Sequence, residues 1–135
     1  MAADNFVDNK LLCGVTNDLD EELFHFSNHK PWQSGLFSKI LVKADDLRIV
    51  LIAMDVGATM KEHHTDGTTS IQVLQGRLCI HIEDKTQHLQ TRQMLTLAAG
   101  IKHDLEALDD SAFLLTISWP ASAKLQSLPH RGYGS

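Results

Sequence analysis

Short apolar segments separated by regularly spaced turn signals dominate the chain from its middle onward. The turn signals recur roughly every 8 to 12 residues, and the segments between them are rich in Val, Ile, Leu and Thr. They are Asp45-Asp46, Gly57, Asp66-Gly67, Gly76, Asp84-Lys85, Arg92-Gln93, Gly100 and Asp109-Asp110. This spacing is typical of an all-β sandwich or barrel. We therefore predict an all-β fold of about eight strands.

Alternation of apolar and polar positions predicts which polar side chains face the interior. Thr69 lies two residues before Ile71, so the pleat of a strand places both on one face. His103 stands in the same relation to Leu105. We expect the side chains of Thr69 and His103 to point into the barrel.

Two segments are apolar on both faces. They are Leu47–Met54 and Ala112–Trp119, the second of which ends at Pro120. Such strands are covered on both sides, here by a second sheet or by a partner subunit. The pattern makes a homodimer the expected assembly.

One segment before the strands has a helical pattern. Residues 17–28 begin with Asn17 and Asp18 as alternative caps, followed by acidic residues that favour a helix N-terminus. Leu19, Leu23 and Phe26 follow at helical spacing. We predict a short helix that packs across the barrel.

The length of 135 residues suits one domain. We divide the chain into an N-terminal extension with the short helix (1–35), a barrel (36–119) and a C-terminal tail (120–135), and we expect the tail to be loosely held at its end. The 43% hydrophobic and 21% charged contents are those of a folded globular protein.

Composition and charge also restrict the class of partner and the expected location of the protein. The longest apolar run is Ile49–Met54, far below the roughly 20 residues of a membrane-spanning helix. The first ten residues lack the basic region of a secretory signal, so we expect a cytoplasmic protein. The net charge of −5 disfavours nucleic acid as a partner. Cys13 and Cys79 have neither the number of a disulfide scaffold nor a zinc-ligand spacing.

Eight histidines invite a search for metal ligands, because neutral imidazole is a common ligand of transition metals. Surface or capping roles are expected for those in the helix, the loop after it, a polar strand and the tail, namely His25, His29, His88 and His130. His81 alternates with the inward-facing Ile80, so it should point outward. Alternation turns His103 inward, whereas His63 and His64 are adjacent and point to opposite faces of a regular strand.

The stretch GATMKEHHTDGTTSIQVLQG, from Gly57 to Gly76, resembles the first sequence motif of the cupin family, G(X)5HXH(X)3-4E(X)6G. Gly57, His63 and Gly76 match its first glycine, first histidine and last glycine. Thr65 and Thr69 replace its second histidine and its glutamate.

The second cupin motif, G(X)5PXG(X)2H(X)3N, is matched at Gly100 and His103. Arg92, Ala98 and Ala107 stand at its first glycine, its proline and its asparagine. Each motif therefore keeps one histidine.

The resemblance covers Leu36 to Trp119 and implies a small single-domain cupin, a double-stranded β-helix or jelly roll of the RmlC-like type. It implies a ligand pocket inside the barrel at His63, Thr65, Thr69 and His103. His63 and His103 would be the metal ligands. Which of His63 and His64 turns inward stays open, and both can ligate only if a bulge intervenes. The cofactor is either a divalent transition metal (Fe, Mn, Ni, Cu or Zn) or none.

Three functions remain open. The first is a module that binds a small organic ligand inside the barrel. The second is a metal-dependent dioxygenase, isomerase or lyase acting on a small acid or carbonyl compound. The third is a dimeric regulatory scaffold.

Overall fold

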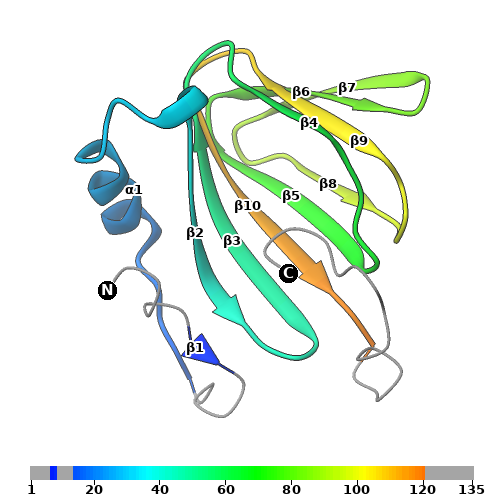
Figure 1. The fold of residues 1–135 in the computed structure, drawn as a ribbon, viewed down its shortest axis with the longest axis horizontal. Helices are drawn as coiled ribbons and strands as arrows, with labels where there is room; N and C mark the ends of the chain where they lie inside the picture. Colours follow the sequence, from blue (N-terminus) through cyan, green and yellow to red (C-terminus); the bar gives the residue numbers. More distant parts are fainter. Residues whose placement is uncertain (1–6, 9–13, 121–135) are drawn as a thin grey trace.

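The computed structural model describes residues 7–8 and 14–120, with the backbone alone at Val7, Asp8, Glu62 and His63. The strands form two sheets, and a short helix lies between β1 and the other strands in the chain (Figure 1). The elements are β1 (Val7–Asp8), α1 (Leu19–Ser27), a 3-10 turn (Gln33–Gly35), β2 (Leu36–Lys43), β3 (Leu47–Met54), β4 (Thr59–His63), β5 (Thr68–Gln75), β6 (Arg77–Ile82), β7 (Lys85–Gln90), β8 (Met94–Leu97), β9 (His103–Ala107) and β10 (Ser111–Ser118). The described residues thus form ten strands where the turn spacing indicated about eight, because β1 and β8 are too short to show alternation.

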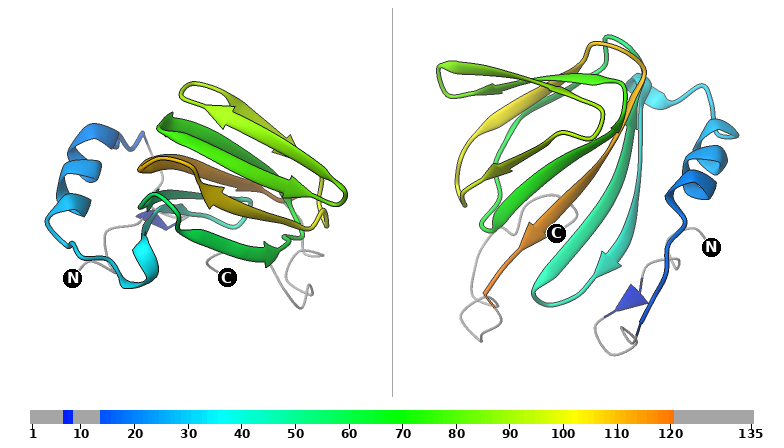
Figure 2. Two further views of the ribbon diagram at one scale, coloured as in Figure 1. Left: turned by 90° about the horizontal axis from the view of Figure 1, so that it is seen from above. Right: turned by 180° about the vertical axis from the view of Figure 1, so that it is seen from behind.

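The strands form one sheet in the order β1-β2-β3-β10-β5-β8 and a second in the order β4-β9-β6-β7. The two sheets curve toward one another (Figures 1 and 2). All pairings are antiparallel except that of β1 with β2.

The main hydrophobic core lies between the two sheets. Its members come from both, and most are less than 3% exposed: Val50, Ile52, Met54, Met60, Ile71, Val73, Leu78, Ile80, Leu89, Leu105, Ala107, Phe113, Leu115, Ile117 and Trp119. In β6 the core residues Leu78 and Ile80 alternate with the exposed His81, as the sequence predicted.

A second cluster covers the outer face of β3. Phe26 of α1 is 3% exposed and packs in one cluster with Leu51 and Ala53 of β3. Figure 1 shows α1 on this outer side of the larger sheet. A helix of the same chain therefore accounts for the two-sided burial of β3, which does not require a partner subunit. The homodimer stays a prediction.

Helix α1 begins where the sequence placed a cap. The Asp18 carboxylate accepts a hydrogen bond from the backbone N–H of Glu21 at 3.1 Å. This contact satisfies one of the N–H groups that a helix leaves unpaired at its start. Glu22 then binds Lys39 of β2 at 2.8 Å, which joins the helix to the sheet.

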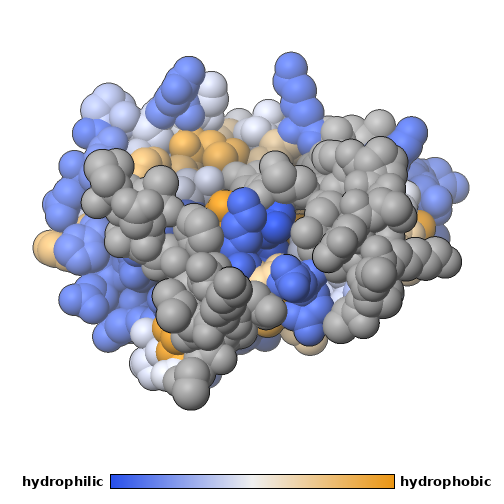
Figure 3. All heavy atoms as spheres, turned by 60° about the horizontal axis from the view of Figure 1, so that its bottom comes forward, coloured by the Kyte–Doolittle hydropathy of each residue, from blue (hydrophilic) through white to orange (hydrophobic). Residues whose placement is uncertain are grey.

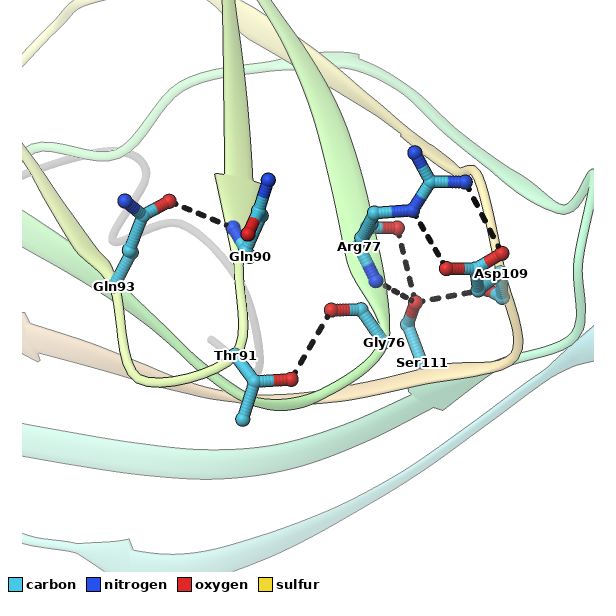
Figure 4. Close-up of polar contacts among 7 residues, drawn as sticks. All are labelled: Gly76, Arg77, Gln90, Thr91, Gln93, Asp109 and Ser111. Carbon is cyan, nitrogen blue, oxygen red and sulfur yellow. Dashed lines mark hydrogen bonds and ion pairs between the residues drawn. The ribbon is translucent and has the colours of Figure 1, made fainter.

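The β5–β6 turn is held by side-chain contacts with the segment that joins β9 to β10 (Figure 4). Gly76 adopts φ 82°, and a Cβ there would clash with the carbonyl oxygen of Asp110. The Ser111 hydroxyl accepts from the backbone N–H of Arg77 at 3.1 Å. The Arg77 guanidinium binds both oxygens of Asp109, at 2.7 and 3.3 Å, and its hydrogen bond lowers the pKa of the Asp109 carboxyl.

Candidate functional site

Several buried polar side chains lie at one end of the space between the sheets. In β9, His103 is 2% exposed and lies on the same face as Leu105 and Ala107, both of the core. In β5, Thr69 is 2% exposed and lies on the same face as Ile71. Both side chains occupy the inward positions that alternation assigned to them.

The two candidate metal-binding histidines are placed on directly opposed backbone positions. His63 and His103 are Cα partners in the β4–β9 pair. The register of this pair shifts between Met60 and His63, the kind of irregularity that reverses a pleat. The side chain of His63 lies outside the described part of the structure. His64 follows the end of β4 and is half-buried.

The two threonines at the cupin ligand positions are hydrogen-bonded to one another. The hydroxyls of Thr65 and Thr69 lie 2.9 Å apart, and the Thr65 hydroxyl also donates to the carbonyl oxygen of Gly67 at 2.8 Å. Thr65 is 3% exposed. Their hydroxyls therefore close the turn that leads into β5.

A buried cation that no sequence motif marked lies at the same end. Arg48 of β3 is 1% exposed and shares the inward face with Val50 and Ile52. Its guanidinium carbon lies 5.2 Å from the ring centroid of Trp119, within the range of a cation–π contact. The run Leu47–Met54 looked uniformly apolar, but period-2 alternation within it already places Arg48 inward.

Strand register relates Arg48 to the threonines. Ile117 of β10 is the Cα partner of Arg48 on one side and of Thr69 on the other. Two strand spacings, about 10 Å, therefore separate Arg48 from Thr69 along the sheet. Figure 3 views the molecule from this end, where hydrophobic side chains are visible between hydrophilic ones.

One further polar atom is buried close to the threonines. Asp66 Oδ2 is shielded from solvent and accepts no hydrogen bond within the described part of the chain. A buried carboxylate oxygen is stabilised by a donor. A hydroxyl group on a bound molecule can supply that donor.

The fit of a metal ion to these residues is poor. His103 Nδ1 lies 3.1 Å from the carbonyl oxygen of Ile101, so that nitrogen carries the proton and Nε2 the lone pair. The threonine hydroxyls are occupied within the turn. Among the described side chains, no three His, Cys, Asp or Glu residues are grouped to hold an ion. One imidazole is too few for a divalent transition metal, so the metal at His63 and His103 stays a prediction.

A separate cavity of about 180 Å³ lies outside the core, between α1 and the ends of β3 and β5. Its lining includes Phe26, Trp32, Met54 and Gln75. Within it, Lys30 binds Asp55 at 3.0 Å and covers the Trp32 ring at 4.4 Å. The lysine therefore contacts both the acidic side chain and the aromatic ring at this cavity. Neither His103 nor Arg48 lines the cavity.

Some expectations fall on residues outside the described part of the chain, namely those for Cys13, His130 and most of the tail. No helix in the described residues has both the length and the apolar character needed to cross a membrane.

Comparisons with known proteins indicate the same fold. The sequence model of the family of AraC-like ligand-binding domains matches residues 48–131. No curated protein matches the sequence.

Solved structures support the jelly-roll prediction. A conserved protein of unknown function from Streptococcus pyogenes is 26% identical, with a TM-score of 0.67 over 84% of this chain and 95% of that chain. A cupin superfamily protein from Desulfitobacterium hafniense is 21% identical, with a TM-score of 0.64 over 70% and 86%. KdgF from a Halomonas species is 23% identical, with a TM-score of 0.60 over 70% and 91%. The predicted cupin fold is confirmed.

Proposed function

Because the chain belongs to the family of AraC-like ligand-binding domains, which have a cupin-type fold, we propose that it binds a small organic acid between its two sheets. The observation that carries this proposal is the buried, inward-facing guanidinium of Arg48.

A buried arginine is a costly way to fill a core. Removing one charge from water costs several kcal/mol, and apolar residues of similar volume often give a protein of equal or greater stability. The guanidinium stays charged at any ordinary pH and presents paired donors that match a carboxylate. A guanidinium that faces the space between the sheets is therefore suited to bind an anionic group of a small molecule.

The surroundings of Arg48 suit the rest of such a ligand. The inward-facing side chains of Val50, Ile52 and Leu115 are apolar, as contact with a short carbon skeleton requires. His103 offers one polar contact at the same end, and Asp66 Oδ2 offers an acceptor for a ligand hydroxyl. We therefore favour a small acid that also carries a hydroxyl group.

The test compares acids with their uncharged amides. Tag-free protein is titrated calorimetrically with glycolate and glycolamide, and with benzoate and benzamide. We expect the acids to bind and their amides to bind more weakly.

Arg48→Met should then weaken binding of the acid by at least about tenfold, since a charge-assisted hydrogen bond contributes about 1.5–3 kcal/mol. Lys102→Met makes the same change of net charge at an exposed position next to His103 and should leave binding unchanged. Acids that bind no better than their amides, or an Arg48→Met variant that binds like the wild type, would show the proposal to be wrong.

A further inference from the structure

A second chemical cluster lies on the outer face of the smaller sheet. His81 Nδ1 is 2.5 Å from Asp104 Oδ1, and His81 Nε2 is 3.8 Å from the sulfur of Cys79. Cys79 and His81 are two residues apart on β6, and Asp104 is the Cα partner of His81 on β9. This face points away from the core, so the cluster is independent of the barrel interior.

Asp104 determines which ring nitrogen of His81 carries the proton. A carboxylate beside Nδ1 accepts a hydrogen bond from the N–H at that nitrogen, which leaves the lone pair of the neutral ring on Nε2. That lone pair is directed at the sulfur of Cys79. The same carboxylate–histidine arrangement orients the imidazole in zinc sites.

The electrostatics of the cluster disfavour a catalytic thiolate. Burial, followed by the carboxylates of Glu106 and Asp104, raises the pKa of the Cys79 thiol. Activated cysteines have the opposite shift, because they lie beside positive charge. The carboxylates near Cys79 instead attract a cation.

The spacing of the two ligand atoms fits one metal ion. Zinc lies about 2.3 Å from a thiolate and about 2.0 Å from an imidazole nitrogen. An ion at these distances bridges a sulfur and a nitrogen 3.8 Å apart with an angle at the metal of about 120°. The separation of the two atoms therefore suits one shared ion.

A third ligand is within reach on the next strand. His88 of β7 is the Cα partner of Cys79, and its neighbour Leu89 is buried in the core, so His88 points outward beside Cys79. Directly opposed side chains in an antiparallel pair have Cβ atoms about 5 Å apart. In the arrangement described, no three such residues surround one point, so ligation by His88 requires its exposed side chain to rotate towards the ion.

We propose that the outer face of β6 and β7 binds Zn²⁺ through Cys79, His81 and His88, with Asp104 positioning the ring of His81. Binding forms a Zn–S bond and releases the thiol proton to solvent, without any oxidation or reduction. Water completes the coordination, as in other zinc sites with three protein ligands.

The experiment uses Co²⁺ as a spectroscopic probe for the zinc site in reduced, tag-free full-length protein. Wild type should show a thiolate-to-cobalt charge-transfer band that Zn²⁺ abolishes by competition. Cys79→Ser should lose the band, whereas Cys13→Ser, the matched control at the second cysteine, should keep it. His103→Ala should also keep it, which separates this site from any metal in the barrel.

Affinity for Co²⁺ should fall at least about tenfold in His81→Ala and in His88→Ala, and by about 10- to 100-fold in Asp104→Asn. Thr86→Ala, the cross-strand neighbour of His81 on the same face, should bind normally. Circular dichroism verifies that each variant is folded.

Absence of the band in wild type, or its survival in Cys79→Ser, would overturn the proposal. Unchanged affinity in His81→Ala would do the same. Unchanged affinity in His88→Ala alone would overturn the third ligand.

Discussion

Replacement of Phe26 tests whether α1 is an integral cover of the larger sheet. Phe26 is 3% exposed, and its ring packs edge-on against Phe37 of β2 at 4.8 Å between centroids. Removing a buried phenylalanine side chain costs about 3–5 kcal/mol, through lost apolar burial and the cavity that remains. Phe26→Ala should lower the free energy of unfolding by that amount.

The same helix supplies a matched control. Phe24 is two residues away and 68% exposed, so Phe24→Ala should change the free energy of unfolding by no more than about 0.5 kcal/mol. The hydrogen bond from Trp32 Nε1 to the backbone carbonyl of Phe26, at 2.9 Å, is retained in Phe26→Ala, so the difference reports side-chain packing.

Urea unfolding, followed by far-ultraviolet circular dichroism, measures both variants. Phe26→Ala should also melt roughly 10 °C below the wild type. Equal stability of the two variants, or a loss below about 1 kcal/mol in Phe26→Ala, would refute the conclusion that α1 covers β3. A transition midpoint that rises with protein concentration in the wild type would indicate that a second copy contributes to stability.

Two further predictions concern the turn in Figure 4. The folded state lowers the pKa of Asp109, so its ion pair with Arg77 stabilises the protein above the ordinary pKa of an aspartate and is lost as the pH falls through the lowered value. Urea unfolding between about pH 6 and pH 3 should therefore show less acid destabilisation in Arg77→Met than in the wild type, and identical pH profiles would contradict the role of the pair. Gly76→Ala should destabilise strongly, because its Cβ meets the backbone oxygen of Asp110, whereas Gly100→Ala, with similar φ and open space, should cost only about 1 kcal/mol. Thermal denaturation of the two alanine variants checks this, and an equal loss would mean that φ alone governs both positions.

Alternation along the chain was enough to predict the faces of the strands. It placed His103 and Thr69 on inward positions and His81 on an outward one, and each lies on the predicted face. A strand has a period of two, so the face of one residue determines that of its neighbours. The same rule places Arg48 on the inward face with Val50, although the rest of the run Leu47–Met54 is apolar.

Alternation could not predict which element covers the outer face of β3. An apolar outer face requires a cover, but it does not say whether a helix, a second sheet or another subunit supplies it. Packing of Phe26 of α1 against Leu51 and Ala53 answers the question within the described chain. The helix itself was predicted, but its docking position was not.

By itself, the sequence determined the all-β architecture, the turns and the helix, because these depend on local periodicity and on capping and turn residues. Only the tertiary structure decided which polar groups meet. The Thr65 and Thr69 hydroxyls bind one another instead of remaining open as ligands, and His81 meets Asp104, which lies 23 residues away in the chain. Strand register decides which distant residues become neighbours. Register depends on how distant segments pair, and no local sequence pattern predicts that pairing.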